Sequence, residues 1–383
     1  MRKGFDLKKR VLIVTSGGLD RSGVPSVIMT IVRGLKNDCV FDIMLSAPEA
    51  DDYLPEFKGY GGRVFPYVKR RFRLSLLNTL SDFLRPVSLY FGTRRVITAN
   101  GPYDAVHCFN EFDMAGSLAA AAVRKVPIRV GHVNKTWGNR GGPLTRLYRR
   151  YCRCLINRYA TDRLGCSRLA CDCFYAPGAR TRIINNPYDE QRFYWDPDAA
   201  VTGGGLHMVQ VGYLCDNKNQ RFTLEVFRSV AEKIPEAKLT FVGADSAYGK
   251  ALKKDVCAKG LEDCVTFLPS DTDIPGLLNS CSLLMLPSRA EGFGIVLIEA
   301  QAMGLFCYAS DTVPKETDLG GVRFLPLSSG PGKWAEAILK DHFYEKKIPR
   351  DCSAFSVAGF TADIRRVYKI DGSYSDLNSK RGD

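Results

Sequence analysis

The sequence of 383 residues has no apolar run of the roughly 18–20 residues that a helix needs to cross a bilayer. Its start, MRKGFDLKKRVLIVTSGG, is basic but holds only a short apolar run before the glycines. That run is too short for the apolar core of a secretory signal. These absences favour a cytoplasmic protein whose first apolar run is a buried strand.

The sequence also lacks a regular cysteine framework, although it contains thirteen cysteines. Five of them cluster in the first half: Cys152, Cys154, Cys166, Cys171 and Cys173. Zinc sites usually place one closely spaced cysteine pair opposite another across a loop, and this cluster does not. Buried free thiols in a reducing cytosol are therefore favoured over zinc.

A dinucleotide-binding fingerprint is missing as well. The first glycine loop, SGGLDRSG, departs from the G-x-G-x-x-G spacing, and residues 36–45 have no convincing acidic strand end. A nicotinamide-dependent oxidoreductase is therefore a weaker alternative, which dinucleotide binding in calorimetry would revive.

Acidic residues are scarce only in the first half. The net charge is +13, and residues 1–200 hold 32 Lys+Arg against 18 Asp+Glu. The basic stretch 69–95 places leucines between arginines. It indicates either a solvated domain helix or a surface that contacts acidic lipid or a lipid-linked phosphate. Nucleic acid is not expected as a partner, because no nucleic-acid module accompanies the charge.

Short β-branched runs alternate with helix-like stretches along the chain, which predicts parallel sheets covered by helices on both faces. The predicted strands are 10–16, 41–47, 104–109, 128–134, 162–167 and 182–187, then 207–212, 237–243, 264–269, 282–288, 306–310 and 322–327. The first helix is predicted at 26–35, with Ser26 as a possible N-cap.

A polar, glycine-rich stretch at 188–205 is the best candidate for a linker. The fold class is therefore α/β, with two tandem Rossmann-like, doubly wound domains facing across a cleft that their strand ends line. We predict a first domain at 1–190, a second at 191–350, a helix within 351–371 that returns to the first domain, and a disordered tail at 372–383.

The stretch PSRAEGFGIVLIEAQAMG (287–304) is the most informative part of the sequence. It predicts a strand end, a glycine turn and a helix N-terminus, whose unpaired amides suit a phosphate or an oxygen-rich ligand. Glu291 lies in the turn, and Glu299 lies among apolar residues one to two turns into the helix. Two carboxylates can accept hydrogen bonds from paired hydroxyls, so a bound sugar or ribose would explain Glu299.

This block resembles the nucleotide-sugar signature of family 4 glycosyltransferases with the GT-B fold, of the type that assembles bacterial capsular and exopolysaccharides. Other segments resemble the same family in the expected order: SGGLDRSGVPSVIMTIVRGL (16–35), YDAVHCFNEF (103–112), ATDRLGCSRLACDCF (160–174) and IINNPYDEQRF (183–193). The resemblance implies a retaining transferase that needs no metal or other cofactor. It also implies a nucleotide-sugar donor, UDP-linked, and a glycan or polyprenyl-linked acceptor.

The resemblance also implies roles for individual residues. Glu291 would hold hydroxyls of the donor sugar, Lys218 would neutralise the leaving diphosphate, and His132 would lie near the acceptor. The remaining donor-binding candidates are Gly17, Gly18, Tyr213, Gly292, Phe293, Gly294, Ile295 and Glu299.

One residue departs from the family pattern. Tyr213 stands where the family has an arginine that helps to hold the diphosphate, and tyrosine carries no positive charge at neutral pH. Arg289 and Arg221 are candidates to replace that charge. The departure keeps open a second interpretation, a non-catalytic relative that binds a nucleotide or a glycan. The basic first domain further suggests peripheral contact with the inner face of the cell membrane.

Overall fold

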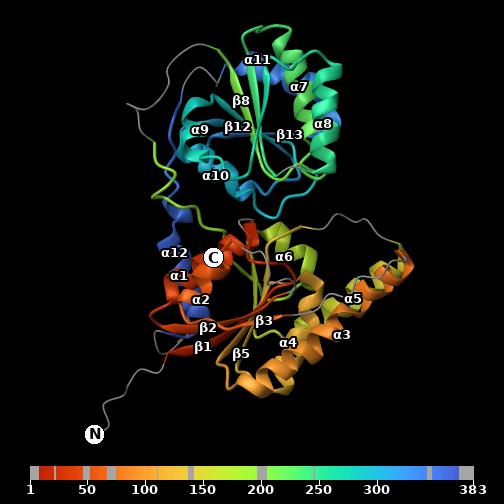
Figure 1. Cartoon of the computed structure of the whole chain (residues 1–383), viewed down its shortest axis with the longest axis vertical. Coiled ribbons are helices and arrows are strands. Elements are labelled where there is room, and N and C mark those ends of the chain that lie inside the picture. The colour runs from red at the N-terminus through yellow and green to blue at the C-terminus, as the bar shows by residue number, and fades with distance from the viewer. Residues whose placement is uncertain are drawn as a thin grey trace. The chain divides into compact units, whose positions relative to one another are not determined.

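The computed structural model describes residues 8–20, 23–45, 52–66, 75–109, 111–136, 142–195, 205–244, 246–342 and 347–370, and for 75–82 the backbone alone. The predicted tail at 372–383 and half of the predicted linker, residues 196–204, lie outside these residues. The chain divides into two compact units, one of residues 1–186 with 357–383 and one of residues 187–356. Each unit is a parallel sheet covered by helices (Figure 1).

Unit 1 contains a seven-stranded parallel sheet in the order β3-β2-β1-β4-β5-β6-β7. Its strands are β1 (Lys9–Val14), β2 (Cys39–Leu45), β3 (Val64–Pro66), β4 (Ala105–Cys108), β5 (Ile128–Val133), β6 (Asp162–Gly165) and β7 (Arg182–Ile183). Its helices are α1 (Gly23–Leu35), α2 (Leu54–Gly59), α3 (Ser75–Asn100), α4 (Met114–Val123), α5 (Pro143–Tyr159), α6 (Arg168–Phe174) and α12 (Val357–Val367). The strand order reverses between β1 and β4, where ligands bind in doubly wound sheets.

Unit 2 contains a six-stranded parallel sheet in the order β10-β9-β8-β11-β12-β13. Its strands are β8 (His207–Val211), β9 (Lys238–Val242), β10 (Val265–Leu268), β11 (Leu283–Leu286), β12 (Phe306–Ser310) and β13 (Val322–Leu325). Its helices are α7 (Gln220–Ala231), α8 (Ala247–Ala258), α9 (Ile274–Ser280), α10 (Ile295–Ala302) and α11 (Gly330–Asp341). Figure 1 shows α9 and α10 on one side of this sheet and α7 and α8 on the other. The order reverses between β8 and β11.

Continuous apolar runs produce these sheets, because strands covered on both faces bury every side chain. Val11 to Val14 of β1 and Leu283 to Leu286 of β11 are fully buried. The sequence predicted the strands of both sheets to within a few residues, apart from the short β3. Strand β7 begins at the predicted residue 182 but ends at Ile183. Within the described part of the chain, no helix has both the length and the apolarity to span a bilayer.

The C-terminal helix α12 belongs to unit 1 and packs against α1. Phe360, Ile364 and Val367 of this helix, and Tyr368 directly after it, are buried in the core of unit 1. The chain leaves unit 1 after Asn186 and re-enters it at Val357, so both boundaries differ by a few residues from the predicted 190 and 351.

The predicted N-cap at Ser26 is wrong. Helix α1 begins at Gly23, and Ser26 lies inside it, where its carbonyl accepts a hydrogen bond from Thr30 Oγ1 at 2.9 Å. Pro25 lies in the first turn of this helix, where its missing N–H costs no hydrogen bond.

Candidate functional site

Two loops of unit 2 meet at the point where its strand order reverses. Residues 212–219 follow β8, and residues 287–294 follow β11, the strand paired with β8. Asn219 Nδ2 donates to the carbonyl of Pro287 at 3.2 Å, and Asn217 Nδ2 donates to the carbonyl of Ala290 at 2.8 Å. The amide of Arg289 donates back to the carbonyl of Asn217 at 2.8 Å. These bonds hold the two loops together as one structure.

Lys218 and Glu291, predicted from separate segments, form an ion pair between these loops. Lys218 Nζ lies 2.8 Å from Glu291 Oε2, and their side chains retain 23% and 15% exposure. The stem of Lys218 lies over Gly212, where an added Cβ would meet the lysine Cε at 3.4 Å. Because Gly212 also has a φ of 142°, glycine suits this position. The pair therefore offers one cationic and one anionic group, both reachable by solvent.

The turn before α10 is shaped by Gly294, which caps the helix in the left-handed region with a φ of 89°. A Cβ at this position would meet Leu286 at 3.2 Å and Val313 at 3.4 Å. Phe293 is buried, and its ring lies 5.7 Å from that of Phe355. Gly292 is buried and Ile295 is partly exposed. The turn is thus anchored by an aromatic side chain, and the N-terminus of α10 follows directly.

Glu299 lies in the second turn of α10 and is partly exposed. Its carboxylate has no hydrogen bond or ion pair within the described part of the chain. Burial among apolar residues raises its pKa to about 7, while the charge of Arg192 lowers the pKa and that of Asp189 raises it. A carboxylate held at this cost is expected to have a hydrogen-bonding ligand.

Tyr213, which replaces the family's arginine, is 58% exposed after β8. Arg289 lies in the adjoining loop, where its guanidinium donates to the carbonyl of Asp216 and to Asn219 Oδ1, both at 3.2 Å. Arg221 instead pairs with Asp255 of α8 at 2.7 Å. Of the two arginines considered as substitutes, Arg289 is the one in the paired loops.

In unit 1, the predicted residues lie at the carboxyl ends of the central strands. Gly17 and Gly18 follow β1, and the amide of Gly17 donates to Thr15 Oγ1 at 3.3 Å. His132 is the penultimate residue of β5 and is 1% exposed. Its Nδ1 lies 3.1 Å from Nε2 of His107, a buried histidine of β4. Burial lowers the pKa of His132 to about 3, so the imidazole is neutral at physiological pH.

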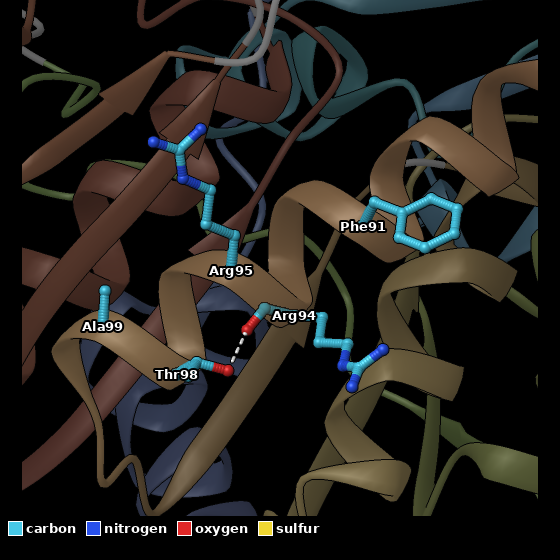
Figure 2. Close-up of a pocket in the computed structure, with 5 residues that line it drawn as sticks. All are labelled: Phe91, Arg94, Arg95, Thr98 and Ala99. Carbon is cyan, nitrogen blue, oxygen red and sulfur yellow. Dashed lines mark hydrogen bonds between the residues drawn. The ribbon is translucent and has the colours of Figure 1, made fainter.

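A shallow hollow of about 310 Å³ lies elsewhere in unit 1, on the exposed side of α3. Figure 2 shows the residues that line it, which are Phe91, Arg94, Arg95, Thr98 and Ala99. None of the predicted site residues lines this hollow. The candidate site is therefore defined by the loops at the strand ends.

The sequence that contains the candidate site is similar to known proteins. Residues 205–340 match the family model described as "Glycosyl transferases group 1", and this range holds Lys218, Glu291 and Glu299. EpsF of Bacillus subtilis (strain 168), named as a glycosyltransferase, is 29% identical over 87% of this chain and 88% of its own. The chain is a glycosyltransferase, and its second half matches the group 1 family.

One further relative matches part of the sequence, and a solved structure matches the fold. The GDP-mannose:cellobiosyl-diphosphopolyprenol alpha-mannosyltransferase of Xanthomonas campestris is 29% identical over 36% of each chain. Anabaena Alr3699/HepE, solved in complex with UDP and glucose, superposes with a TM-score of 0.72 at 18% identity, over 93% of this chain and 98% of its own. The architecture is accordingly GT-B, with two Rossmann-like domains.

Sequence reasoning missed several residues of this glycosyltransferase. Asn217 and Asn219 connect the two loops, and Tyr368 contacts His107 at 2.7 Å. The run DNKNQ (216–220), a few residues after the end of β8, was a usable signal for the asparagines, because amide side chains commonly bond to loop backbone. Tyr368 had no such signal, since its partner lies in β4, far away in the sequence.

Proposed function

We propose that this glycosyltransferase transfers a sugar, with retention of anomeric configuration, from a UDP-sugar to a glycan or lipid-linked acceptor in cell-surface polysaccharide biosynthesis. The observation that carries the proposal is the Lys218–Glu291 pair between two loops at the reversal point of the sheet. A nucleotide donor is supported by HepE, solved with UDP-glucose, and by the Xanthomonas enzyme, named for GDP-mannose. The acceptor class follows the diphosphopolyprenol in that second name.

The chemistry asked of this site is stabilisation of a departing diphosphate and orientation of a sugar. Lys218 Nζ supplies positive charge, Arg289 supplies more from the neighbouring loop, and the N-terminus of α10 adds its partial charge. Glu291 and Glu299 accept hydrogen bonds from hydroxyls of the sugar and of the ribose. When the donor binds, Lys218 exchanges part of its contact with Glu291 for a phosphate oxygen. With these cationic groups, transfer is expected to proceed without a metal ion.

The test is thermal stabilisation by UDP, UDP-glucose, GDP-mannose and ADP-glucose, because a ligand that binds only the folded state raises the melting temperature. UDP and its sugar are expected to stabilise the wild type, and Lys218→Ala and Glu291→Gln are expected to abolish the shift. Lys333→Ala is a matched control, since Lys333 pairs with Glu336 at the same 2.8 Å on the surface of the same unit. Stabilisation by GDP-mannose alone would contradict a UDP-sugar donor and indicate a GDP-sugar donor.

Activity and stereochemistry need a separate measurement. Products formed from the stabilising donor are analysed by NMR, where the anomeric coupling reports retention, and the reaction is repeated with a chelator. An inverted product would contradict the retaining mechanism, and full loss of activity with the chelator would contradict metal independence.

A non-catalytic binding protein is the second candidate, and Tyr213 is the observation that favours it. If the missing guanidinium is what prevents transfer, Tyr213→Arg will create activity in a protein that otherwise only binds the donor. If Arg289 already supplies the charge, the wild type will be active and Arg289→Ala will reduce its turnover.

We further propose that helix α5 lies against an anionic membrane surface. Its seventeen residues include five arginines and no acidic residue. Leu144, Leu147 and Tyr151 recur at helical spacing and are 69%, 64% and 61% exposed. The ring of Tyr148 packs edge-on against Phe83 of α3 at 4.9 Å, and α3 exposes Phe91 beside Arg94 and Arg95. Basic helices with exposed apolar residues bind acidic lipid by combining both terms.

Vesicle sedimentation tests this contact. Binding is expected to vesicles containing phosphatidylglycerol, to be absent with phosphatidylcholine alone, and to fall with added salt. Tyr151→Glu is expected to release the protein. Tyr194→Glu is the matched control, because Tyr194 is 63% exposed but lies in unit 2. Equal binding by both variants, or equal binding to both lipids, would contradict the proposal.

A further inference from the structure

Three buried aromatic side chains form a hydrogen-bonded chain inside unit 1. Tyr368 Oη lies 2.7 Å from His107 Nδ1, and His107 Nε2 lies 3.1 Å from His132 Nδ1. Tyr368 and His107 are fully buried, and His132 is 1% exposed. The two imidazole rings are nearly parallel, at 12°. The chain therefore connects the C-terminal segment to the carboxyl end of β5.

The far end of this hydrogen-bonded chain has no protein partner among the residues that the structure describes. Nε2 of His132 is buried, and no hydrogen-bond partner for it exists within the described residues. Buried polar atoms are nearly always paired with protein or ordered water, so an unpaired one at a strand end is a candidate for binding a ligand. Two residues later, both polar atoms of the Asn134 amide are also buried and unpaired within the same described region. The carboxyl end of β5 thus presents several hydrogen-bonding groups that have no partner in the described part of the chain.

The two hydrogen bonds that connect Tyr368, His107 and His132 can be donated in one of two directions. In the first, the Tyr368 hydroxyl donates to His107 Nδ1, and His107 Nε2–H donates to His132 Nδ1. In the second, both bonds are reversed, and the buried Tyr368 hydroxyl hydrogen is left without an acceptor among the described residues. The first direction leaves His132 Nε2–H as the unpaired buried donor instead, but that donor lies at the carboxyl end of β5, where a substrate oxygen can accept from it. The Tyr368 hydroxyl lies in the core of unit 1, so only the first direction lets a bound ligand satisfy the unpaired donor, and it is favoured. It places the remaining proton on His132 Nε2.

We propose that Tyr368 and His107 are positioning residues that fix His132 as the Nε2–H tautomer, so that it donates a hydrogen bond to a hydroxyl or phosphate oxygen of a bound substrate. This inference rests on the proposed glycosyltransferase function. It deepens that function by assigning His132 the role of a neutral donor rather than that of a base that takes up a proton. The tautomer is set by a tyrosine from the far end of the chain.

Substitutions at position 107 can distinguish the effect of hydrogen-bond direction from the effect of side-chain packing. A glutamine at position 107 can accept from Tyr368 through its carbonyl oxygen and donate to His132 through its amide, so it preserves the direction of the chain. A leucine at the same position can do neither. Tyr368→Phe removes only the hydroxyl and keeps the ring in the core.

The experiment is long-range 15N–1H NMR of the full chain labelled at histidine, which has only four such residues. His132 is expected as the Nε2–H tautomer in the wild type and in His107→Gln, from pH 6 to 8. His107→Leu and Tyr368→Phe are expected to give a mixture of tautomers. A wild-type His132 in the Nδ1–H form, or an unchanged tautomer in both latter variants, would overturn the inference.

Kinetics give a second readout. With the donor identified by thermal shift, His107→Leu should lower kcat by roughly 10- to 100-fold, with the donor KM little changed, and His107→Gln should recover part of this loss. Thermal melts of each variant report whether it folds. Because NMR needs no turnover, an inactive wild type that holds the Nε2–H tautomer would refute the enzyme and leave the hydrogen-bonded chain standing. Equal kcat in the leucine and glutamine variants would refute the positioning role.

Discussion

Replacement of Glu299 by glutamine is expected to stabilise the protein and to weaken its binding of a nucleotide. In the folded protein, burial raises the pKa of this carboxyl to about 7, against an ordinary value near 4.3. Between these two values the folded state holds more protons than the unfolded state. The free energy of unfolding of the wild type therefore falls as the pH rises through this window, and it stays low above pH 7.

The magnitude follows from the size of the pKa difference. At about 1.4 kcal/mol per unit, the full difference costs roughly 4 kcal/mol above pH 7, and partial exposure of the side chain reduces this to about 1–2 kcal/mol. Glutamine has no charge to desolvate, so Glu299→Gln should gain that amount at pH 8. For a unit of this size, the gain corresponds to a melting temperature about 2–8 °C higher. At pH 4.5 the two proteins should be nearly equal.

Differential scanning calorimetry between pH 4.5 and 8 measures this effect. Glu262→Gln is the control, because Glu262 is exposed on the same unit. The nucleotide should stabilise the wild type more than Glu299→Gln, so its presence should change the order of their melting temperatures. The reason is that an amide accepts hydrogen bonds from ribose hydroxyls more weakly than a carboxylate does, which should lower the affinity about tenfold. If Glu299→Gln is no more stable than the wild type at pH 8, or keeps the same dependence on pH, the account of a desolvated carboxylate is wrong.

Other predictions concern the paired loops. Glu291→Ala should abolish turnover while changing the unfolding free energy by less than about 1 kcal/mol, measured in urea, because its pair with Lys218 is partly solvated. Gly294→Ala should destabilise by roughly 1–3 kcal/mol in the same assay, since its φ is 89° and its Cβ would press on Leu286. Lys218→Met should lower kcat by roughly 100-fold in a transfer assay. A fully active Lys218→Met variant would exclude this lysine as the group that neutralises the diphosphate.

The sequence predicted the strands of both sheets other than β3, because a strand buried on both faces leaves a continuous apolar run. It also predicted the turn near residue 290, because the EGFG block combines a strand end, glycines and a helix start within one segment. Ser26 was placed wrongly as a cap, since a serine suits both a cap and a helix interior near its start. Local patterns do not distinguish these two positions when other signals allow the helix to begin earlier.

Contacts between distant segments could not be predicted. The pair of Lys218 with Glu291 joins residues whose loops meet only after β8 and β11 have paired. The contact of Tyr368 with His107 depends on a return of the chain to unit 1, and nothing near either residue indicates the other. Propensity and periodicity describe neighbours in sequence, whereas these bonds depend on the strand order.

The late position of α12 in the chain has a consequence for biosynthesis. Phe360, Ile364 and Val367 complete the core of unit 1, yet the ribosome makes them after all of unit 2. Until then, the apolar side of α1 that they cover remains open to water and to chaperones, and a nascent chain stopped at residue 186 would be prone to aggregate. A shortened protein in which a short glycine linker connects residue 186 to residues 357–370 should yield a soluble unit 1. A protein that ends at residue 186 should not be soluble.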